Sequence, residues 1–226
     1  MDVESHSTTG GRQVVESLNI TAGKVNLDGD LVIPSNAKGL VIFAHGSGSS
    51  RHSPRNIQVA RALQNNGLAT LLFDLLTREE EAADDMSGRY RFDVSLLGRR
   101  TVEAVDFVKR TPGLQRLNVG LFGASTGAAA ALVAAAERPD AAGAVVSRGG
   151  RPDLAGEYLP RVMAPTLLIV GGHDSTVIGM NRHAMSLMKA ETELVIVPGA
   201  THLFEEPGAL DEVARLAGEW FSKHLV

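Results

Sequence analysis

A serine between two glycines is the residue of this sequence best suited to nucleophilic chemistry. Residues 123–127 read G-A-S-T-G, and they lie between an apolar run over residues 118–122 and an alanine-rich segment. The pattern G-x-S-x-G is typical of a sharp strand-to-helix turn with the serine at its tip, where glycines avoid collisions with the strand and the helix. The helix N-terminus adds a positive dipole near a developing oxyanion. The segment predicts Ser125 as a nucleophile, and the alternative is a helix N-cap, which serine also favours.

A serine nucleophile requires a general base, and the base requires a carboxylate that orients it. His202 and Asp174 each follow an apolar run that ends in a glycine-containing turn, in the segments IVPGATH and IVGGHD. The chain order serine, acid, histidine is the one that accompanies this kind of turn. We therefore predict His202 as the base and Asp174 as its partner. The alternative for His202 is an ordinary histidine of a surface loop.

Two other histidines and one other aspartate compete for these roles. His183 falls within a predicted helix, whereas the base should lie on a loop, and His173 adjoins the candidate acid too closely to accept its orienting hydrogen bond. Asp153 follows an earlier strand and is the rival acid. A contact between Asp153 and His202 would overturn the choice of Asp174.

A glycine-rich loop follows an earlier apolar run and could bind the oxyanion. Residues 45–49 read H-G-S-G-S, directly after the run over residues 39–44. Such a loop exposes backbone N–H groups, which an oxyanion hole requires. We expect the N–H groups of Ser47 and Thr126 to serve, and His45 to brace the loop. The alternative is a plain turn between a strand and a helix.

Three arginines near these motifs raise the question of an anionic substrate. Arg51, Arg55 and Arg148 follow the ends of apolar runs. Arginine pairs with carboxylates through two parallel hydrogen bonds, so these residues are candidates for substrate binding. The alternative is that they are structural ion-pair partners of Asp74, Asp93 or an acidic loop, because long charged side chains mostly lie at the surface.

Strand-like and helix-like segments alternate along the chain and must carry these residues. Continuous apolar runs are typical of strands that are buried on both faces. Ser53 before Pro54 indicates the start of a helix, as does Asp93, whereas the acidic segment over residues 77–88 indicates a solvated loop. The strands are predicted over residues 14–20, 24–33, 39–44, 68–73, 118–122, 142–147, 165–170 and 193–197, and the helices over residues 53–66, 93–111, 128–138, 176–189 and 207–224.

This alternation predicts an α/β fold with about eight strands in a mostly parallel sheet and helices on both faces. Ligands of such sheets bind beyond the carboxyl ends of the strands, which is where the candidate residues fall. Between Ser147 and Pro165 there is room for only a helical turn or two. We therefore expect no large lid over the site.

Composition limits the possible functions. The 226 residues fit one domain, 44% of them are hydrophobic and 21% charged, and the net charge of −4 provides no basic surface for nucleic acid. The chain has no cysteine, its histidines lack the spacing H-E-x-x-H or H-x-H, and no strand precedes G-x-G-x-x-G. We expect a single domain over residues 1–226, with residues 1–12 as a flexible segment and with neither metal nor cofactor.

The N-terminal residues and the hydropathy pattern bear on location. The segment MDVESHSTTGGRQ is polar, without the basic and apolar stretches of a secretory signal. No apolar run approaches the ~20 residues that cross a bilayer. We expect a cytoplasmic protein, a monomer or small homo-oligomer, that binds neither membranes nor nucleic acid.

With these motifs in place, the sequence resembles an α/β-hydrolase over nearly its whole length. The segments AHGSGSSRHSPRN, LLFDLLT, GASTGAAAALVAAA and VVSRGGRPDL are similar to the dienelactone-hydrolase-like branch, whose domains also occur fused to phosphoribosyltransferase domains. The resemblance implies Ser125 as nucleophile, His202 as base and Asp174 as its partner. True dienelactone hydrolases carry cysteine in the elbow, and this sequence carries serine, so the lactone substrate does not follow from the resemblance.

The expected function is that of a serine carboxylesterase acting on small-molecule esters through an acyl-enzyme on Ser125. One alternative keeps the same three residues in an acyltransferase or a cofactor-free perhydrolase. A second alternative is a non-catalytic module, in which the loop over residues 45–49 and the nearby arginines bind an anion.

Overall fold

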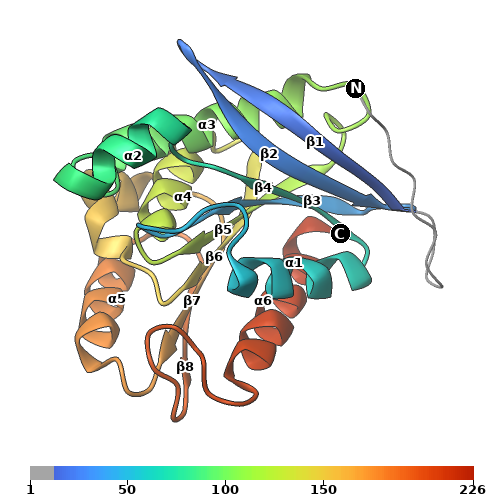
Figure 1. Ribbon diagram of the computed structural model, residues 1–226. Helices are drawn as coiled ribbons and strands as arrows, with labels where there is room; N and C mark the ends of the chain where they lie inside the picture. Colours follow the sequence, from blue (N-terminus) through green and yellow to red (C-terminus); the bar gives the residue numbers. More distant parts are fainter. Residues whose placement is uncertain (1–12) are drawn as a thin grey trace.

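A computed structural model describes residues 13–226 of the chain, and its centre is one eight-stranded sheet (Figure 1). The strand order is β1-β2-β4-β3-β5-β6-β7-β8; the strands from β4 to β8 in this order are parallel to one another, whereas β1 and β2 pair antiparallel and β2 pairs antiparallel with β4. The predicted mostly parallel α/β sheet is therefore confirmed. The strands are β1 (Gln13–Ala22), β2 (Val25–Pro34), β3 (Gly39–Ala44), β4 (Leu68–Phe73), β5 (Asn118–Ala124), β6 (Ala142–Arg148), β7 (Thr166–Gly171) and β8 (Thr192–Val197).

Helices cover both faces of this sheet, which is why its central strands are buried over all or nearly all of their length. One apolar core joins the sheet to α3 and α4, and a second core on the opposite face joins it to α1 and α6 (Figure 1). The helices are α1 (Pro54–Asn65), α2 (Arg78–Ser87), α3 (Val94–Arg110), α4 (Thr126–Glu137), α5 (Ser175–Leu187) and α6 (Ala209–Leu225).

Two helices begin where their capping residues predict. The Ser53 hydroxyl accepts a hydrogen bond from the Asn56 N–H at 3.4 Å, and Pro54 occupies the first helical position of α1. The Asp93 carboxylate accepts from the Leu96 N–H at 2.9 Å at the start of α3. These starts fix where the preceding loops leave the sheet, and the loop before α1 is the one that carries residues 45–49.

The solvated loop that we expect over residues 77–88 is wrong, because this segment forms α2. Thr77 and Glu80 form a capping box, in which the Thr77 hydroxyl accepts from the Glu80 N–H at 3.3 Å and the Glu80 carboxylate accepts from the Thr77 N–H at 2.9 Å. Three glutamates in the first turn also favour the helix, since the N-terminal end of the dipole is positive. Glu80 further binds Arg100 of α3 through two hydrogen bonds of 2.6 Å.

Between β6 and β7 the chain forms only a short 3-10 segment, η1 (Pro152–Arg161). This agrees with the expectation of no large lid. No helix within residues 13–226 is long and apolar enough to cross a membrane. The expected flexible segment over residues 1–12 lies outside the described residues.

Candidate active site

Ser125 occupies a strained backbone conformation at the junction of β5 and α4. Its φ is 51° and its ψ is −122°, a combination of backbone angles that residues other than glycine rarely adopt. A Cβ on Gly127 would lie 2.2 Å from the Ala44 carbonyl oxygen, and one on Gly123 would lie 2.4 Å from the Ala128 Cα, so both positions require glycine. Ser125 occupies the N-cap position of α4, as the alternative expects, but its side chain makes no capping hydrogen bond to the helix.

The turn after β6 connects Ser125 to the loop that carries His202. The Ser125 N–H donates to the Arg148 carbonyl at 3.3 Å, and the Arg151 N–H donates to the Ser125 carbonyl at 3.0 Å. Between these arginines, a Cβ on Gly149 would lie 2.9 Å from the His202 carbonyl oxygen and 3.6 Å from its ring Cε1. The absence of a side chain at residue 149 therefore lets the His202 loop approach the serine turn.

His202 and Asp174 are in direct contact, as the sequence predicts. The distance from His202 Nδ1 to Asp174 Oδ2 is 2.7 Å. The two residues follow β8 and β7, whose carboxyl ends are level because Gly171 pairs with Val197 in parallel register. Since an ionised carboxylate only accepts, Nδ1 carries the proton and Nε2 is left as the basic nitrogen.

The rival residues have other partners or places. Asp153 binds the guanidinium of Arg151 with a shortest contact of 2.8 Å, so it is not the partner of His202. His183 lies within α5. The His173 backbone N–H donates to the Ala200 carbonyl at 3.0 Å, which ties the loop after β7 to the segment before His202.

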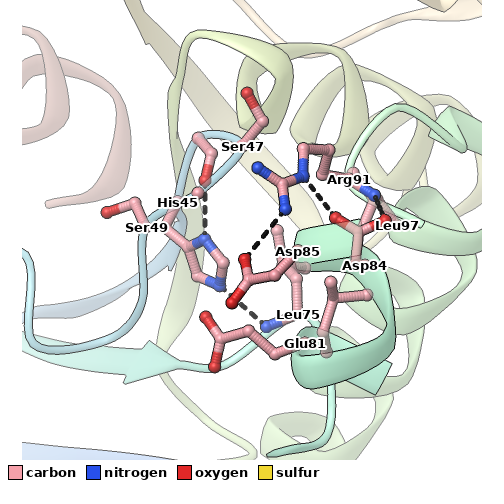
Figure 2. Close-up of a pocket in the computed structure, with 12 residues that line it drawn as sticks. His45, Ser47, Ser49, Leu75, Glu81, Asp84, Asp85, Arg91 and Leu97 are labelled. Atoms are coloured by element: carbon pink, nitrogen blue, oxygen red, sulfur yellow. Dashed lines mark hydrogen bonds and ion pairs between the residues drawn. The ribbon is translucent and has the colours of Figure 1, made fainter. Parts of the chain in front are cut away.

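His45 braces the loop after β3, as expected (Figure 2). Its ring contacts the Gly46 carbonyl through Nδ1 at 2.9 Å and accepts the Leu75 N–H at Nε2 at 2.9 Å. Accepting at Nε2 requires a neutral ring with its proton on Nδ1. Burial is the main cause that lowers the pKa of His45 below its ordinary value of 6.5, which favours this neutral form.

The Ser47 amide is not free to meet an oxyanion in the way we expect from the sequence. Its N–H donates to the Thr126 hydroxyl oxygen at 3.0 Å. The reason is that Thr126 begins α4 beside this loop, where Gly46 packs so closely that a Cβ on it would lie 3.1 Å from the Ser125 Cβ. The N–H of Thr126 itself belongs to the first helical residue and has no acceptor within the helix.

The expectation that Arg51 binds substrate is not supported. Its guanidinium forms ion pairs with Asp74, with Asp30 at 3.2 Å and with Asp28 at 3.7 Å, and its backbone N–H donates to Asp74 at 2.7 Å. The positive charge of Arg51 is therefore paired with three carboxylates and is not left for a substrate. Arg51 joins the hairpin of β1 and β2 to the end of β4, which is the structural role given above as the alternative.

Arg148 stands in contrast, because its charge is buried and no carboxylate within residues 13–226 pairs with it. The residue is 7% exposed, and its Nε and Nη1 atoms are buried without a hydrogen-bond partner among the described residues. Burial, and then the positive charge of Arg55, lower the pKa of Arg148 to about 10. Arg55 itself contacts the exposed Glu205 at 3.1 Å, while its Nε is buried and unpaired.

A pocket lies between the loop over residues 45–49 and α2 (Figure 2). Its apolar wall comes from Leu75, Leu76 and Leu97, and the polar wall includes the ion pair of Arg91 with Asp84 and Asp85. These polar residues were missed in the sequence because we expected a solvated loop there. The capping-box pattern T-x-x-E at Thr77 is the signal that could have revealed them. No group of three potential metal ligands occurs within residues 13–226.

Comparisons with known proteins agree with this architecture. The model of the dienelactone hydrolase family matches residues 27–223. The crystal structure of a dienelactone hydrolase from Anabaena variabilis is 58% identical, covers 94% of this chain and 98% of its own, and superposes with a TM-score of 0.92. Est1E from Butyrivibrio proteoclasticus is 17% identical with a TM-score of 0.75 over 92% of this chain and 98% of its own, which shows a shared fold.

A longer relative also matches. A protein of Mycobacterium tuberculosis named "Putative phosphoribosyl transferase" is 53% identical over 210 residues, which are 93% of this chain and 46% of that protein. The chain thus spans about half the length of the curated relatives it matches. From the family model and the 58% identical structure, the chain belongs to the dienelactone hydrolase family and has the α/β-hydrolase fold.

Proposed function

We propose that the protein is a serine hydrolase that cleaves small carboxylic esters. Ser125 is the nucleophile, His202 the general base and Asp174 the residue that orients His202. One observation carries the proposal: a serine held at φ 51° without a capping hydrogen bond, next to a loop whose histidine lies 2.7 Å from a carboxylate. A purely structural serine has no need of that strain, and a purely structural histidine has no need of a carboxylate at Nδ1.

The reaction proceeds in two halves. The Ser125 hydroxyl attacks the acyl carbon while His202 Nε2 takes its proton, and the protonated ring then gives that proton to the leaving alcohol. Asp174 stabilises the positive ring throughout. Water next attacks the acyl group on Ser125, with His202 again as base, and this step releases the carboxylic acid and restores the serine.

The test is a p-nitrophenyl ester series of rising chain length with the wild type and Ser125→Ala. We expect wild-type turnover and a loss on the order of 10⁴–10⁶ in kcat for the variant. His202→Ala should cost about as much, and Asp174→Asn less than either, because the acid only orients and stabilises the ring. Asp153→Asn is the matched control and should remain active. A folded, active Ser125→Ala variant would refute the proposal.

The buried charge of Arg148 supports a narrower substrate class, namely esters that carry an anion near the scissile bond. An unpaired guanidinium at the end of β6, with the charge of Arg55 nearby, is costly unless an anion accompanies it. The Arg148 carbonyl accepts a hydrogen bond from the Ser125 N–H, so the backbones of the two residues are in contact. An anion that binds the Arg148 guanidinium would therefore lie no farther from Ser125 than about the length of the Arg148 side chain. Arg148 and Arg55 would act mainly on substrate binding, since they would hold the anion of the substrate and that of the transition state equally well.

A matched pair of substrates tests this preference: p-nitrophenyl hydrogen succinate and neutral p-nitrophenyl butyrate. We expect Arg148→Met to raise KM for the succinate ester, to leave its kcat nearly unchanged and to leave the butyrate ester unaffected. Succinate should also raise the melting temperature of the wild type and not of the variant. Arg51→Met is the control and should affect both esters equally through stability. Equal effects of Arg148→Met on both esters would remove the anion from the proposal.

A further inference from the structure

The hydrogen bond between the Ser47 N–H and the Thr126 hydroxyl has a consequence for catalysis. An oxyanion hole needs donors that converge on one point, one from the residue after the nucleophile and one from the loop after β3. The loop donor here is aimed at a side-chain oxygen of that same next residue, at 3.0 Å. The Thr126 hydroxyl therefore occupies the place toward which the loop amide points.

We propose that the Thr126 hydroxyl is itself an oxyanion donor, and that the Ser47 amide acts through it. This inference rests on the proposed function and adds a catalytic residue to it. In the tetrahedral intermediate, the oxyanion accepts one hydrogen bond from the Thr126 N–H and a second from the Thr126 O–H. The Ser47 N–H continues to donate to the hydroxyl oxygen and is not itself a contact of the oxyanion.

The surroundings of Thr126 fit this role. The residue is 4% exposed, so a hydrogen bond from its hydroxyl acts in a nearly dry environment, where it is stronger than in water. Within residues 13–226 the hydroxyl proton has no acceptor of its own, and only the oxygen is engaged. Donation from Ser47 to that oxygen polarises the O–H bond and makes it a better donor, because successive hydrogen bonds strengthen one another.

Two substitutions separate the hydroxyl from the shape of the side chain. Thr126→Val keeps the branched shape and removes the hydroxyl, whereas Thr126→Ser keeps the hydroxyl and removes the methyl group. We expect Thr126→Val to lower kcat for p-nitrophenyl butyrate by about 10²–10³, with KM within about twofold of the wild type, because the donor acts on the transition state. Thr126→Ser should retain most of the activity.

Each other outcome overturns the proposal. If Thr126→Val is as active as the wild type or faster, the hydroxyl is a spectator or obstructs the Ser47 amide, which then serves directly. If both variants lose activity equally, the methyl group and its packing matter and the hydroxyl does not.

A second measurement keeps this test distinct from that of the proposed function. A trifluoromethyl ketone adds to an activated serine and forms a tetrahedral adduct with an oxyanion, which ¹⁹F NMR detects without turnover. We expect the adduct in the wild type and in Thr126→Ser, weaker by about 10² in Thr126→Val, and none in Ser125→Ala. Equal adduct affinity in the wild type and Thr126→Val refutes the role of Thr126 alone. A wild type that forms no adduct and hydrolyses no ester refutes both proposals.

Discussion

At the scale of single residues, three features are ones that a stability-optimised fold would not select: the strained Ser125, the buried neutral ring of His45, and Arg148, which has no carboxylate partner within residues 13–226. The left-handed conformation of Ser125 costs about 1–3 kcal/mol. The buried charge of Arg148 is a second local cost. Local conflicts of this kind concentrate at functional positions, where selection for activity outweighs local stability.

The strain at Ser125 predicts that activity and stability change in opposite directions. Ser125→Gly should raise the free energy of unfolding by about 1 kcal/mol relative to Ser125→Ala, because only glycine adopts this φ and ψ without a steric penalty. Both variants should be inactive, and both remove the hydroxyl, so Ser125→Ala is the matched control. Urea unfolding of the two variants measures the difference. A lower stability for Ser125→Gly would mean that the turn is not strained.

His45 predicts a pH dependence of stability. Its pKa is lower in the folded protein than in the unfolded chain, so below pH about 6.5 the unfolded chain binds the proton more readily. The contribution of His45 to the free energy of unfolding is therefore fully present above that pH and is lost as the pH falls. We expect His45→Gln, which keeps a donor and an acceptor, to lose less unfolding free energy than the wild type between pH about 7 and about 5.

The comparison with another histidine variant isolates the effect of His45. His183 lies exposed on α5, so His183→Gln should follow the wild-type pH profile of unfolding. The largest slope that one titrating group can add is about 1.4 kcal/mol per pH unit. Parallel profiles for His45→Gln and the wild type would show that the His45 ring is not held neutral.

At the scale of elements, α2 forms one wall of the pocket, and Glu80 joins it to α3. Glu80 closes the capping box of α2 and also binds Arg100 of α3, whose side chain is 6% exposed. Asp84, which follows one turn later in α2, binds Arg91 at the polar wall of the pocket. The position of this wall therefore depends on Glu80, although Glu80 does not line the pocket.

We expect Glu80→Ala to lower the free energy of unfolding by about 2–4 kcal/mol, because it leaves Arg100 buried without its carboxylate. Hydrogen exchange should accelerate over residues 75–91, where α2 loses its cap. Glu79→Ala removes a carboxylate of the same helical turn that contacts Thr77 but pairs with no buried arginine within residues 13–226, and it should cost much less than Glu80→Ala. Acceleration over residues 75–91 that is no larger than the acceleration in the sheet would contradict a specific role of Glu80 in attaching α2.

At the scale of the whole molecule, one sheet is shared by two apolar cores. Strands β3 and β5 contribute to both, with Leu40 and Leu121 on one face and Phe43 and Phe122 on the other. Loss of either core would expose the same strands. The described chain should therefore unfold as a single cooperative unit, in keeping with one domain.

Two probes that report on different parts of the molecule test this cooperativity. Trp220, the only tryptophan, lies in α6 against the second core, and far-UV circular dichroism follows all helices. We expect the same urea midpoint from both signals. An earlier midpoint for Trp220 fluorescence would show that the face covered by α1 and α6 unfolds separately.

Local sequence signals are enough to predict most of the helices and strands and the chain order of the candidate site. Apolar runs predict the buried strands, and Ser53 and Asp93 mark helix starts, because these signals act between residues close in the chain. The turn around Ser125 is likewise local, since its glycines, its strand and its helix are contiguous. The helix α2 was wrongly predicted as a loop, although its capping box is also a local signal. The prediction gave more weight to the acidic composition of the segment.

Which charged and polar groups meet depends instead on how distant segments pack in the folded chain. The choice of Asp174 over Asp153 depends on a contact between residues 28 positions apart, and the bond from Ser47 to Thr126 joins residues 79 positions apart. Arg51 and Arg148 look equivalent in the sequence, yet three carboxylates surround Arg51 and none in the described part of the chain pairs with Arg148. Such pairings arise where different strands end at one edge of the sheet, and no local pattern along the chain encodes which side chains meet there.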